Sequence, residues 1–236
     1  FYECKKLETI IIPSSVTSIE SCAFQDCSNL KTIELAKESA LTNIGNQAFR
    51  ECKKLEKITI PSDVTTIGDY AFDKCNSLKE INFAEKSQLA QLGEAAFWEC
   101  SSLEKIAIPP NVSLIGRNTF YNCSKLKEVT FEKESKLRKI EYCAFLNSAF
   151  TKIVLPASVI NIENGGFYGC YSLQEVVFLG DFKQFNFMFG DYWNNSTKIT
   201  YYACNDAWNS SEAQAFLNNS SHNLIPNPIH MSEENT

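Results

Sequence analysis

The chain has 236 residues, of which 44% are hydrophobic, and it carries 17 phenylalanines, ten cysteines and a formal net charge of −6. This apolar content is enough for a continuous core, whereas an acidic chain without a basic stripe is a poor match for nucleic acid or an anionic membrane surface. No apolar run approaches the roughly 20 residues of a membrane-spanning helix, so we expect no membrane insertion within the chain.

One motif recurs along most of the chain. Its marker is the phenylalanine of an Ala-Phe pair, and successive markers are separated by 23, 25, 23, 25, 23, 25 and 22 residues: Phe1, Phe24, Phe49, Phe72, Phe97, Phe120, Phe145 and Phe167. The shorter turns carry a proline after Ile or Leu (Pro13, Pro61, Pro109, Pro156), and the longer turns replace it with a charged insertion such as LAKESALTNI or FEKESKLRKI. The true period is therefore a pair of turns, 48 residues long, and a fixed period of this kind is typical of solenoids.

Within each turn the apolar residues follow one pattern. Alternation around Ile58 and Ile60 predicts a short parallel strand, which Pro61 ends because proline cannot donate a hydrogen bond to a sheet. Phe72 and Cys75 are three residues apart, a spacing that suits one helical or 3-10 turn with both side chains inward. The predicted strand cores are residues 7–12, 30–35, 55–60, 78–83, 103–108, 126–131, 150–155 and 173–178, with Phe150 in the usual leucine position of the irregular seventh turn.

The unit Leu-x-x-Ile-x-Ile-Pro-x-x-Val-x-x-Ile-Gly-x-x-Ala-Phe-x-x-Cys, seen at residues 55–75, resembles the BspA-type leucine-rich repeats of bacterial and protist cell-surface proteins. The resemblance covers residues 1 to about 180. It implies an α/β-type repeat solenoid, a right-handed superhelix with a parallel β-sheet on its concave face and short helical or 3-10 turns elsewhere. It also implies a non-enzymatic binding module, at the cell surface or secreted, used in adhesion. The copies depart from the motif at Thr119, Gly166, Ser148, Glu20, Glu141 and Glu163.

We expect a single domain. Residues 1–180 form the repeat array of about eight turns, which begins inside a repeat and is therefore expected to lack upstream turns, and residues 181–236 form a C-terminal capping segment. The many aromatic residues after Phe178 favour a hydrophobic plug over a ligand cleft. TKITYY is a candidate ninth, edge strand, SSEAQAFLNN reads as a short helix capped by Ser210 or Ser211, and residues 226–236 read as a loose polar tail.

Most cysteines occupy one position of successive turns, so they should form a column: Cys4, Cys27, Cys52, Cys75, Cys100, Cys123 and Cys170. Parallel side chains make a disulfide between neighbouring turns awkward, and buried free thiols are the favoured interpretation. Cys22 and Cys143 are five turns apart and cannot pair with each other. The sequence has no Cys-x-x-Cys pair with a nearby histidine, so no metal site is expected.

The residues that flank the central isoleucine of each strand predict a surface of alternating charge. Read down the stack they are Thr9, Thr32, Lys57, Glu80, Lys105, Glu128, Lys152 and Glu175, and the residues one position earlier alternate in the opposite phase: Glu8, Lys31, Glu56, Lys79, Glu104 and Lys127. Opposite charges on neighbouring strands stabilise a sheet. The columns are therefore either a neutralised, solvated structural sheet or a recognition surface, with Glu34, Thr59, Asn82, Ala107, Thr130, Val154 and Val177 as a second contact column.

A second candidate surface follows the marker phenylalanine. The next residue is polar in the early turns (Gln25, Arg50, Asp73), which implies exposure, and it is large and apolar in the later ones: Trp98, Tyr121, Leu146 and Tyr168. These four side chains form either an exposed aromatic stripe of the kind used at interfaces or a local cover over the backbone.

Motifs for catalysis or cofactor binding are missing from the sequence, and Gly165-Gly166 are better explained as a turn variant than as a phosphate loop. The candidate partner-binding residues are Lys57, Glu80, Lys105, Glu128, Lys152, Glu175, Trp98, Tyr121 and Tyr168, and the partner is a protein or a glycan. The alternatives are a structural spacer that self-associates and, with less support, an enzyme with a site near Asp181, Asp191 and His222.

Overall fold

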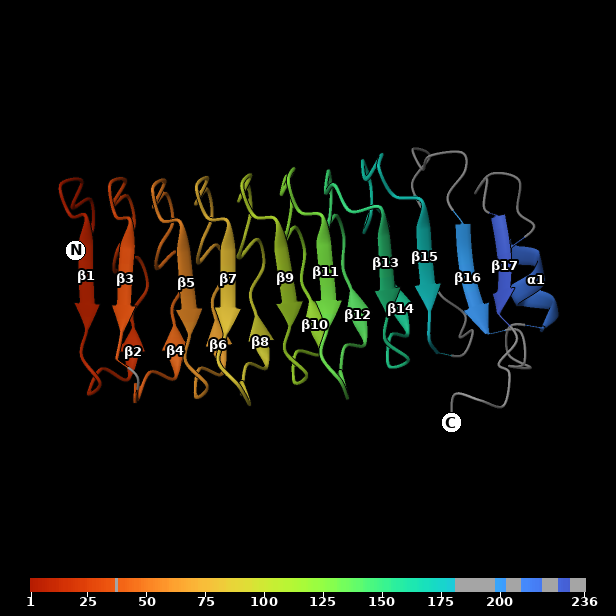
Figure 1. The fold of residues 1–236 in the computed structure, drawn as a ribbon, viewed down its shortest axis with the longest axis horizontal. Helices are drawn as coiled ribbons and strands as arrows, with labels where there is room; N and C mark the ends of the chain where they lie inside the picture. Colours follow the sequence, from red (N-terminus) through yellow and green to blue (C-terminus); the bar gives the residue numbers. More distant parts are fainter. Residues whose placement is uncertain (37, 181–197, 203–208, 218–224, 230–236) are drawn as a thin grey trace.

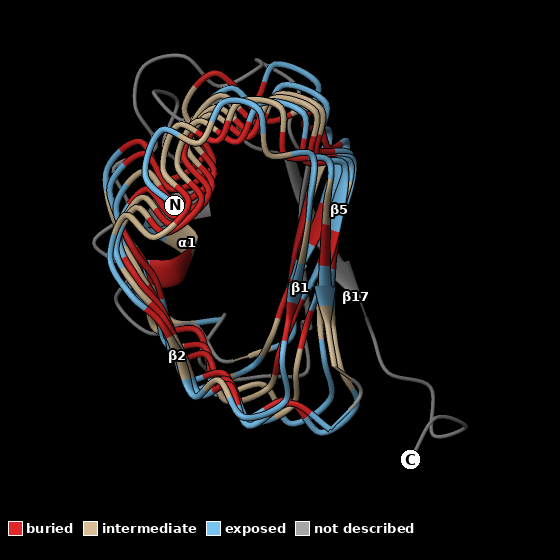
Figure 2. Cartoon of the chain, turned by 90° about the vertical axis from the view of Figure 1, so that its left-hand side faces the viewer, coloured by how far each residue is buried: buried red, intermediate tan, exposed pale blue. Residues whose placement is uncertain are grey.

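The computed structural model describes residues 1–36, 38–180, 198–202, 209–217 and 225–229. The chain is a parallel-strand β-solenoid with almost no helix, in which successive turns lie side by side along one axis (Figure 1). Viewed along that axis, each turn is a closed loop with one long straight side, and buried residues line its interior (Figure 2).

The straight side of each turn is one four-residue strand, and we call the surface that these strands form the long-strand face. It confirms the eight predicted strand cores, although each strand begins two residues later than expected. The first two residues of each predicted core belong instead to a turn, in which the Leu55 N–H, for example, donates to the Cys52 carbonyl over 3.1 Å. The strands are β1 (Thr9–Ile12), β3 (Thr32–Leu35), β5 (Lys57–Ile60), β7 (Glu80–Phe83), β9 (Lys105–Ile108), β11 (Glu128–Phe131), β13 (Lys152–Leu155) and β15 (Glu175–Phe178).

A second side of each turn carries a two-residue strand, and together these strands make the short-strand face. Each contains one buried aliphatic residue of the Val-x-x-Ile pattern, such as Ile67, next to a more exposed one such as Thr66. The strands are β2 (Ser18–Ile19), β4 (Asn43–Ile44), β6 (Thr66–Ile67), β8 (Gln91–Leu92), β10 (Leu114–Ile115), β12 (Lys139–Ile140) and β14 (Asn161–Ile162).

The third side, which we call the arc, contains the marker phenylalanine, and here the expected helical or 3-10 turn is replaced by consecutive β-turns. The Cys75 N–H closes a turn on the Phe72 carbonyl at 3.1 Å, while the Phe72 N–H donates across to Ala96 of the next turn at 2.8 Å. Every second N–H therefore serves the neighbouring turn, which a helix does not permit. The geometry requires positive φ at two positions of each arc, such as Tyr70 (55°) and Lys74 (57°), and in the eighth arc these are glycines, Gly165 and Gly169. Gly165-Gly166 are thus a turn variant, as predicted.

The core is built from columns of equivalent residues, and the marker phenylalanines form one of them. The eight marker phenylalanines stack with successive ring centroids 5.2 to 5.6 Å apart and nearly parallel planes. Phe150 is fully buried and meets Phe145 and Phe167 edge-on, which agrees with its predicted place in the leucine column. One column of aromatic rings thus runs through every turn from Phe1 to Phe167.

The cysteines form a second column. They are free thiols, as predicted, and from Cys27 onward each Sγ–H donates to the phenylalanine carbonyl of the preceding turn over 3.0 to 3.2 Å, as Cys75 does to Phe49. The same carbonyl also accepts an N–H of its own turn, as Phe49 does from Cys52, so it has two donors. Burial raises the pKa of the thiols from Cys27 onward, that of Cys170 to about 12.

The C-terminal end adds two strands and the single helix of the described residues. β16 (Lys198–Tyr202) pairs with β15, but it is an interior strand and not the edge, because β17 (Ile225–Ile229) pairs on its other side (Figure 1). Residues 226–229 are therefore part of the sheet and not of a loose tail. Pro226 and Pro228 explain the position of β17, since proline is tolerated in the last strand of a sheet, where its missing N–H leaves no inner partner unpaired. Helix α1 (Ser211–Leu217) is capped by Ser210, whose Oγ accepts the Ala213 N–H at 3.2 Å.

Candidate functional site

The prolines of the short turns interrupt the hydrogen bonding of the long-strand face. After a strand of a long turn, the next residue donates its N–H to the preceding short turn, as Ala84 does to Ile60 (2.9 Å) and Glu132 to Ile108 (3.1 Å). The equivalent residue of a short turn is a proline and has no N–H to donate. Strand pairs therefore match over four residues at β1/β3, β5/β7, β9/β11 and β13/β15, while β7/β9 keep one matched pair and β3/β5 and β11/β13 belong to separate sheets.

Two hollows lie at these open junctions. The smaller, of about 260 Å³, lies over β7, β9 and β11 and includes the small, exposed Ala107. The larger, of about 670 Å³, lies between β11 and β13, and we call it the β11–β13 groove. Its apolar lining comes from Val129, Phe131, Val154, Pro156, Ala157 and Leu179, and its charged lining from Lys127, Glu128, Glu132, Lys133, Glu134 and Lys152.

Two side chains of the groove are exposed to an unusual degree for their type. Val154 is 38% exposed and Leu179 is 42% exposed. In the same column, Thr59 of β5 and Asn82 of β7 are polar, and the other large exposed aliphatic residue is Ile11 of β1, at the far end of the face from the groove. A contiguous apolar hollow with a charged rim is the feature of this face best suited to bind another molecule.

Six charged residues of the first predicted column lie in one row on the long-strand face. In order they are Lys57, Glu80, Lys105, Glu128, Lys152 and Glu175. The register places Lys57 beside Glu80, Lys105 beside Glu128 and Lys152 beside Glu175. Ion pairs join Glu80 to Lys105 (3.3 Å) and Lys152 to Glu175 (2.8 Å). Exposed pairs of this kind stabilise a fold by only about 0 to 1 kcal/mol, so the row neutralises the face more than it holds it together.

The adjacent charge column is paired only at its N-terminal end. Lys31 contacts Glu8 at 2.9 Å, and this contact lowers the pKa of the Glu8 carboxyl, while Lys79 contacts Glu56 at 3.3 Å. Glu104 and Lys127 make no ion pair within the described part of the chain, and neither does Glu128 of the first column. Lys127 and Glu128 both line the β11–β13 groove. The two charge columns thus leave one cation, Lys127, and one anion, Glu128, without an ion pair at the rim of the β11–β13 groove.

The predicted aromatic stripe along the outer side of the arc is mostly shielded from solvent. The rings of Trp98 and Tyr121 stack at 4.2 Å between centroids with a 17° angle between planes, and the Trp98 Nε1–H donates to Glu99. Trp98, Tyr121 and Tyr168 are half-buried and Leu146 is buried. The structure therefore favours a local cover over the arc. Asp73, expected to be exposed, is only 3% exposed because the Arg50 side chain pairs with it, Nε to Oδ2, at 2.9 Å.

Other predicted features fall outside the described residues. They are the aromatic plug after Phe178, up to Trp193 and again at Trp208, and the titratable groups Asp181, Asp191 and His222 of the enzyme alternative. Within the part that is described, no three His, Cys, Asp or Glu side chains gather as a metal site needs, and no helix is long and apolar enough to cross a membrane.

Sequence reasoning missed the grooves, although their signal was present. A proline directly after each strand of the short turns marks every open junction, and the long turns that precede them end their strands with Leu35, Phe83 or Phe131, which are only half-buried. The combination of an absent N–H and an incompletely buried aromatic or aliphatic residue predicts where the face opens.

The repeat pattern and the solenoid agree with comparisons to known proteins. The family model described as "BspA type Leucine rich repeat region (6 copies)" matches residues 1–109 and 90–223. The chain belongs to the BspA-type leucine-rich repeat family. This is a class of repeat proteins that is generally non-enzymatic and whose members typically bind proteins.

Solved structures of leucine-rich repeat proteins are also similar. A leucine-rich repeat protein from Bacteroides ovatus is 28% identical with a TM-score of 0.63, over 85% of this chain and 57% of that protein, so this BspA-type chain spans little more than half of its relative's length. A leucine rich cell surface protein from Faecalibacterium prausnitzii is 20% identical (TM-score 0.41, 97% and 80% covered), and a leucine-rich repeat protein from T. pallidum is 23% identical (TM-score 0.41, 73% and 59% covered). A search of curated proteins gave no significant match.

Proposed function

We propose that this BspA-type protein is a non-enzymatic binding module, displayed at the cell surface or secreted, that holds a protein partner on its long-strand face and acts in adhesion. The observation that carries the proposal is the β11–β13 groove, an apolar hollow of about 670 Å³ on an otherwise polar, charge-neutralised sheet. The stack presents this face preformed, so a partner binds without a large ordering cost.

The chemistry of the groove favours a protein over a glycan as the partner of this face. Val154 and Leu179 offer aliphatic surface, and the groove has no fully exposed aromatic ring on which a sugar would stack. The free Lys127 and Glu128 match a partner segment that carries an apolar anchor between an acidic and a basic residue. Such rim charges contribute mainly to association rate and specificity, while the desolvated apolar centre contributes most of the affinity.

The test is a binding screen of the purified chain against an array of purified extracellular proteins, followed by titration of each binder. The substitution Val154→Asp introduces a charge at the centre of the groove, and we expect it to weaken binding by at least roughly thirtyfold, since loss of a central contact costs about 2 kcal/mol or more. The matched control is Ile11→Asp, because Ile11 stands in the same column on β1, is even more exposed than Val154 (65% against 38%) and is distant from the groove.

Both variants should melt at the temperature of the wild type, because both positions are exposed. A screen without any binder, or binders whose affinity falls with Ile11→Asp and not with Val154→Asp, contradicts the proposal. Sedimentation of the wild type that shows concentration-dependent dimers, abolished by Val154→Asp, would instead identify the face as a self-association surface.

A further inference from the structure

The short-strand face has a single opening, between β8 and β10, which we call the seam. At every other junction of this face the residue after the short strand donates its N–H to the preceding turn, as Gly93 does to Ile67 (2.8 Å) and Glu141 to Ile115 (2.9 Å). At the seam, Gly116 has no such bond to Leu92, and the Ser113 N–H also has no acceptor within the described residues. β8 and β10 consequently belong to different sheets.

The neighbouring sides of the same two turns remain bonded. Across the arcs, Ala95, Phe97 and Glu99 donate to Arg117, Thr119 and Tyr121 at 2.8 to 2.9 Å. The seam is therefore a local opening in one face and not a break of the solenoid. Two backbone donors and the carbonyl of Leu92, whose equivalents Ile44, Ile67 and Ile115 all accept a bond, are left facing the opening.

Thr119 gives the seam a physical cause. It stands where the other early arcs have alanine, it is fully buried, and its Oγ1–H donates to the Gly116 carbonyl at 2.8 Å. Because the alanine of the earlier turns lacks the extra methyl and hydroxyl groups of Thr119, we infer that the larger side chain displaces Gly116 from the preceding turn. A Cβ placed on Gly93 would lie 2.4 Å from the Gly68 backbone, whereas a Cβ on Gly116 would meet nothing closer than 3.6 Å.

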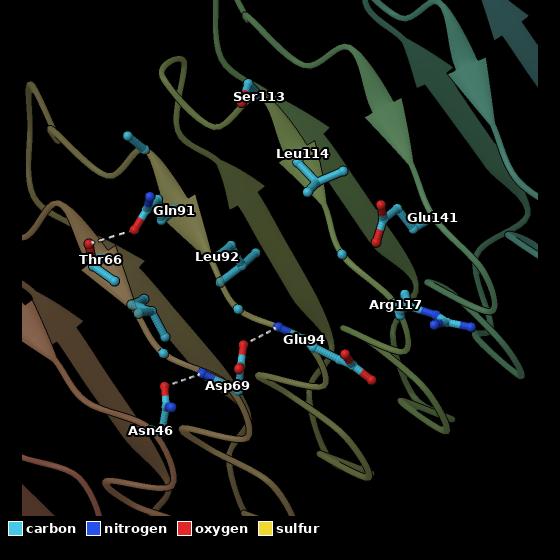
Figure 3. Close-up of a pocket in the computed structure, with 15 residues that line it drawn as sticks. Asn46, Thr66, Asp69, Gln91, Leu92, Glu94, Ser113, Leu114, Arg117 and Glu141 are labelled. Atoms are coloured by element: carbon cyan, nitrogen blue, oxygen red, sulfur yellow. Dashed lines mark hydrogen bonds between the residues drawn. The ribbon is translucent and has the colours of Figure 1, made fainter.

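A cavity of about 520 Å³ lies at the seam, and Figure 3 shows the side chains around it. Six of them end in planar polar groups: Asn46, Asp69, Gln91, Glu94, Arg117 and Glu141. Leu114 adds an aliphatic surface, and it is 36% exposed at a position where the other short strands carry Ser, Asn, Thr, Gln or Lys. The cavity thus combines unpaired backbone groups, planar polar side chains and one aliphatic surface.

The dimensions of the seam exclude an inserted peptide strand. A strand between β8 and β10 would hold them about 9.6 Å apart, twice the usual spacing, whereas Cα atoms of these strands still approach within 8 Å. The group that enters the opening must be thinner than a strand, and it must both accept from the N–H groups of Gly116 and Ser113 and donate to the Leu92 carbonyl. A hydroxyl group does both.

The charges around the cavity exclude an anionic ligand. Among the described residues that line the cavity, Arg117 is the single cation, against the carboxylates of Asp69, Glu94 and Glu141. Lys139, outside the lining, contacts Glu141 at 3.0 Å but also pairs with Glu163, while Asp69 and Glu94 contact no lysine or arginine in the described structure. Asp69 also receives the Glu94 N–H at 2.8 Å (Figure 3), which fixes one carboxylate at the cavity wall. The net negative surroundings repel phosphate, sulfate and acidic sugars.

We propose that the seam is a binding site for a neutral saccharide, whose hydroxyls bridge the unpaired backbone groups of β8 and β10 and whose C–H face packs on Leu114. The site lies on the short-strand face and does not depend on the protein-binding role of the long-strand face. A cavity of this size accommodates one or two sugar rings, in keeping with the usual volume of small-ligand sites.

The first experiment presents a microarray of neutral and acidic oligosaccharides to the purified chain, followed by titration calorimetry with the free sugar of each spot that binds. We expect neutral sugars to bind and acidic ones to be rejected. The substitution Gly116→Leu fills the cavity without backbone strain, and we expect it to weaken binding by at least roughly tenfold, because the hydrogen bonds of the seam are blocked. Thr119→Ala should close the seam and give a similar loss.

Amide hydrogen exchange distinguishes ligand binding at the seam from a purely structural effect of the substitutions. The amides of Ser113 and Gly116 should exchange faster than those of Gly68 and Gly93, and a saturating neutral sugar should slow them. Val154→Asp is the control, since it changes the other face and should leave sugar binding intact. An array with no neutral sugar bound, a preference for acidic sugars, or full binding by folded Gly116→Leu overturns the proposal.

Discussion

The arc and the long-strand face of the same turns differ in how completely neighbouring turns are hydrogen-bonded. In the arc, every junction between turns is bonded through alternating N–H groups, and stacked phenylalanines and thiols fill the interior behind it. On the long-strand face, every second junction has a proline in place of an N–H donor and little or no strand pairing, and exposed charges alternate along the surface. The difference indicates that the arc holds the stack together, which leaves the long-strand face free to vary its surface and to open grooves.

The substitution Phe97→Ala should have the largest effect if the arc, and not the long-strand face, holds the stack together. The Phe97 ring is fully buried between Phe72 and Phe120, each 5.4 Å away between centroids, so its removal leaves a cavity that the rigid stack cannot close. We expect the free energy of unfolding to fall by about 3 to 5 kcal/mol in urea denaturation. Val154→Ala on the opposite face is the control and should change it by less than about 1 kcal/mol. Equal losses in the two variants would contradict the division of roles.

Ser148→Cys should have a smaller effect, and a stabilising one. Ser148 replaces the cysteine of the seventh arc, and its buried Oγ has no hydrogen-bond partner. A thiol is longer and more apolar, so it should reach the Phe120 carbonyl as its neighbours reach theirs, and we expect a gain of about 1 kcal/mol in the same denaturation assay. The reverse change, Cys123→Ser, should cost a similar amount. A loss of stability in Ser148→Cys would show that the column does not depend on the thiol.

The smallest expected effect is the pH dependence of stability that Asp73, on the outer side of the arc, contributes. Burial raises the pKa of Asp73, an effect that Arg50 opposes, and the Oδ1 atom has no hydrogen-bond partner. Because the folded state holds the proton more tightly than the unfolded state, Asp73 contributes most to stability at low pH, and this contribution is lost as pH rises from the usual aspartate range near 3.9 through the raised value. Asp73→Asn removes the dependence.

Melting curves of wild type and Asp73→Asn at several pH values provide the measurement. We expect the wild type to lose stability relative to the variant as the pH rises above about 4, the usual aspartate pKa. If the wild type instead gains relative stability over this range, Arg50 outweighs burial and the pKa of Asp73 is lowered.

Most of the fold could be predicted from the periodicity of the sequence, because the spacing alone determines which residues share a column. The strands, the thiol column and the charge row of Lys57 to Glu175 all follow from the repeat. The β-turns of the arc did not, since Phe72 and Cys75 have the same separation in a 3-10 turn and in a β-turn with a positive φ at Lys74. What separates the two is the destination of every second N–H, which lies in the next turn and has no signature in local sequence.

The candidate site was predicted only in part. The charge row was visible, but which charges remain free depended on side-chain geometry, and the grooves depended on backbone bonds that prolines remove from a neighbouring turn. The burial of Asp73 was missed because its partner Arg50 lies 23 residues earlier, and no local pattern indicates that the two side chains pair rather than both being exposed. The seam depended on one substitution, Thr119, whose effect on Gly116 is steric.

The alternation of turn lengths also constrains how such an array can change its length. Loss of one turn would bring Lys57 beside Lys105 and set one proline-bearing turn directly on another, so that like charges meet and two successive junctions lack donors. Loss or duplication of a 48-residue pair preserves both patterns. Recombination among these repeats is therefore expected to add or remove modules in even numbers, and lengths that differ by an odd number of turns should be selected against.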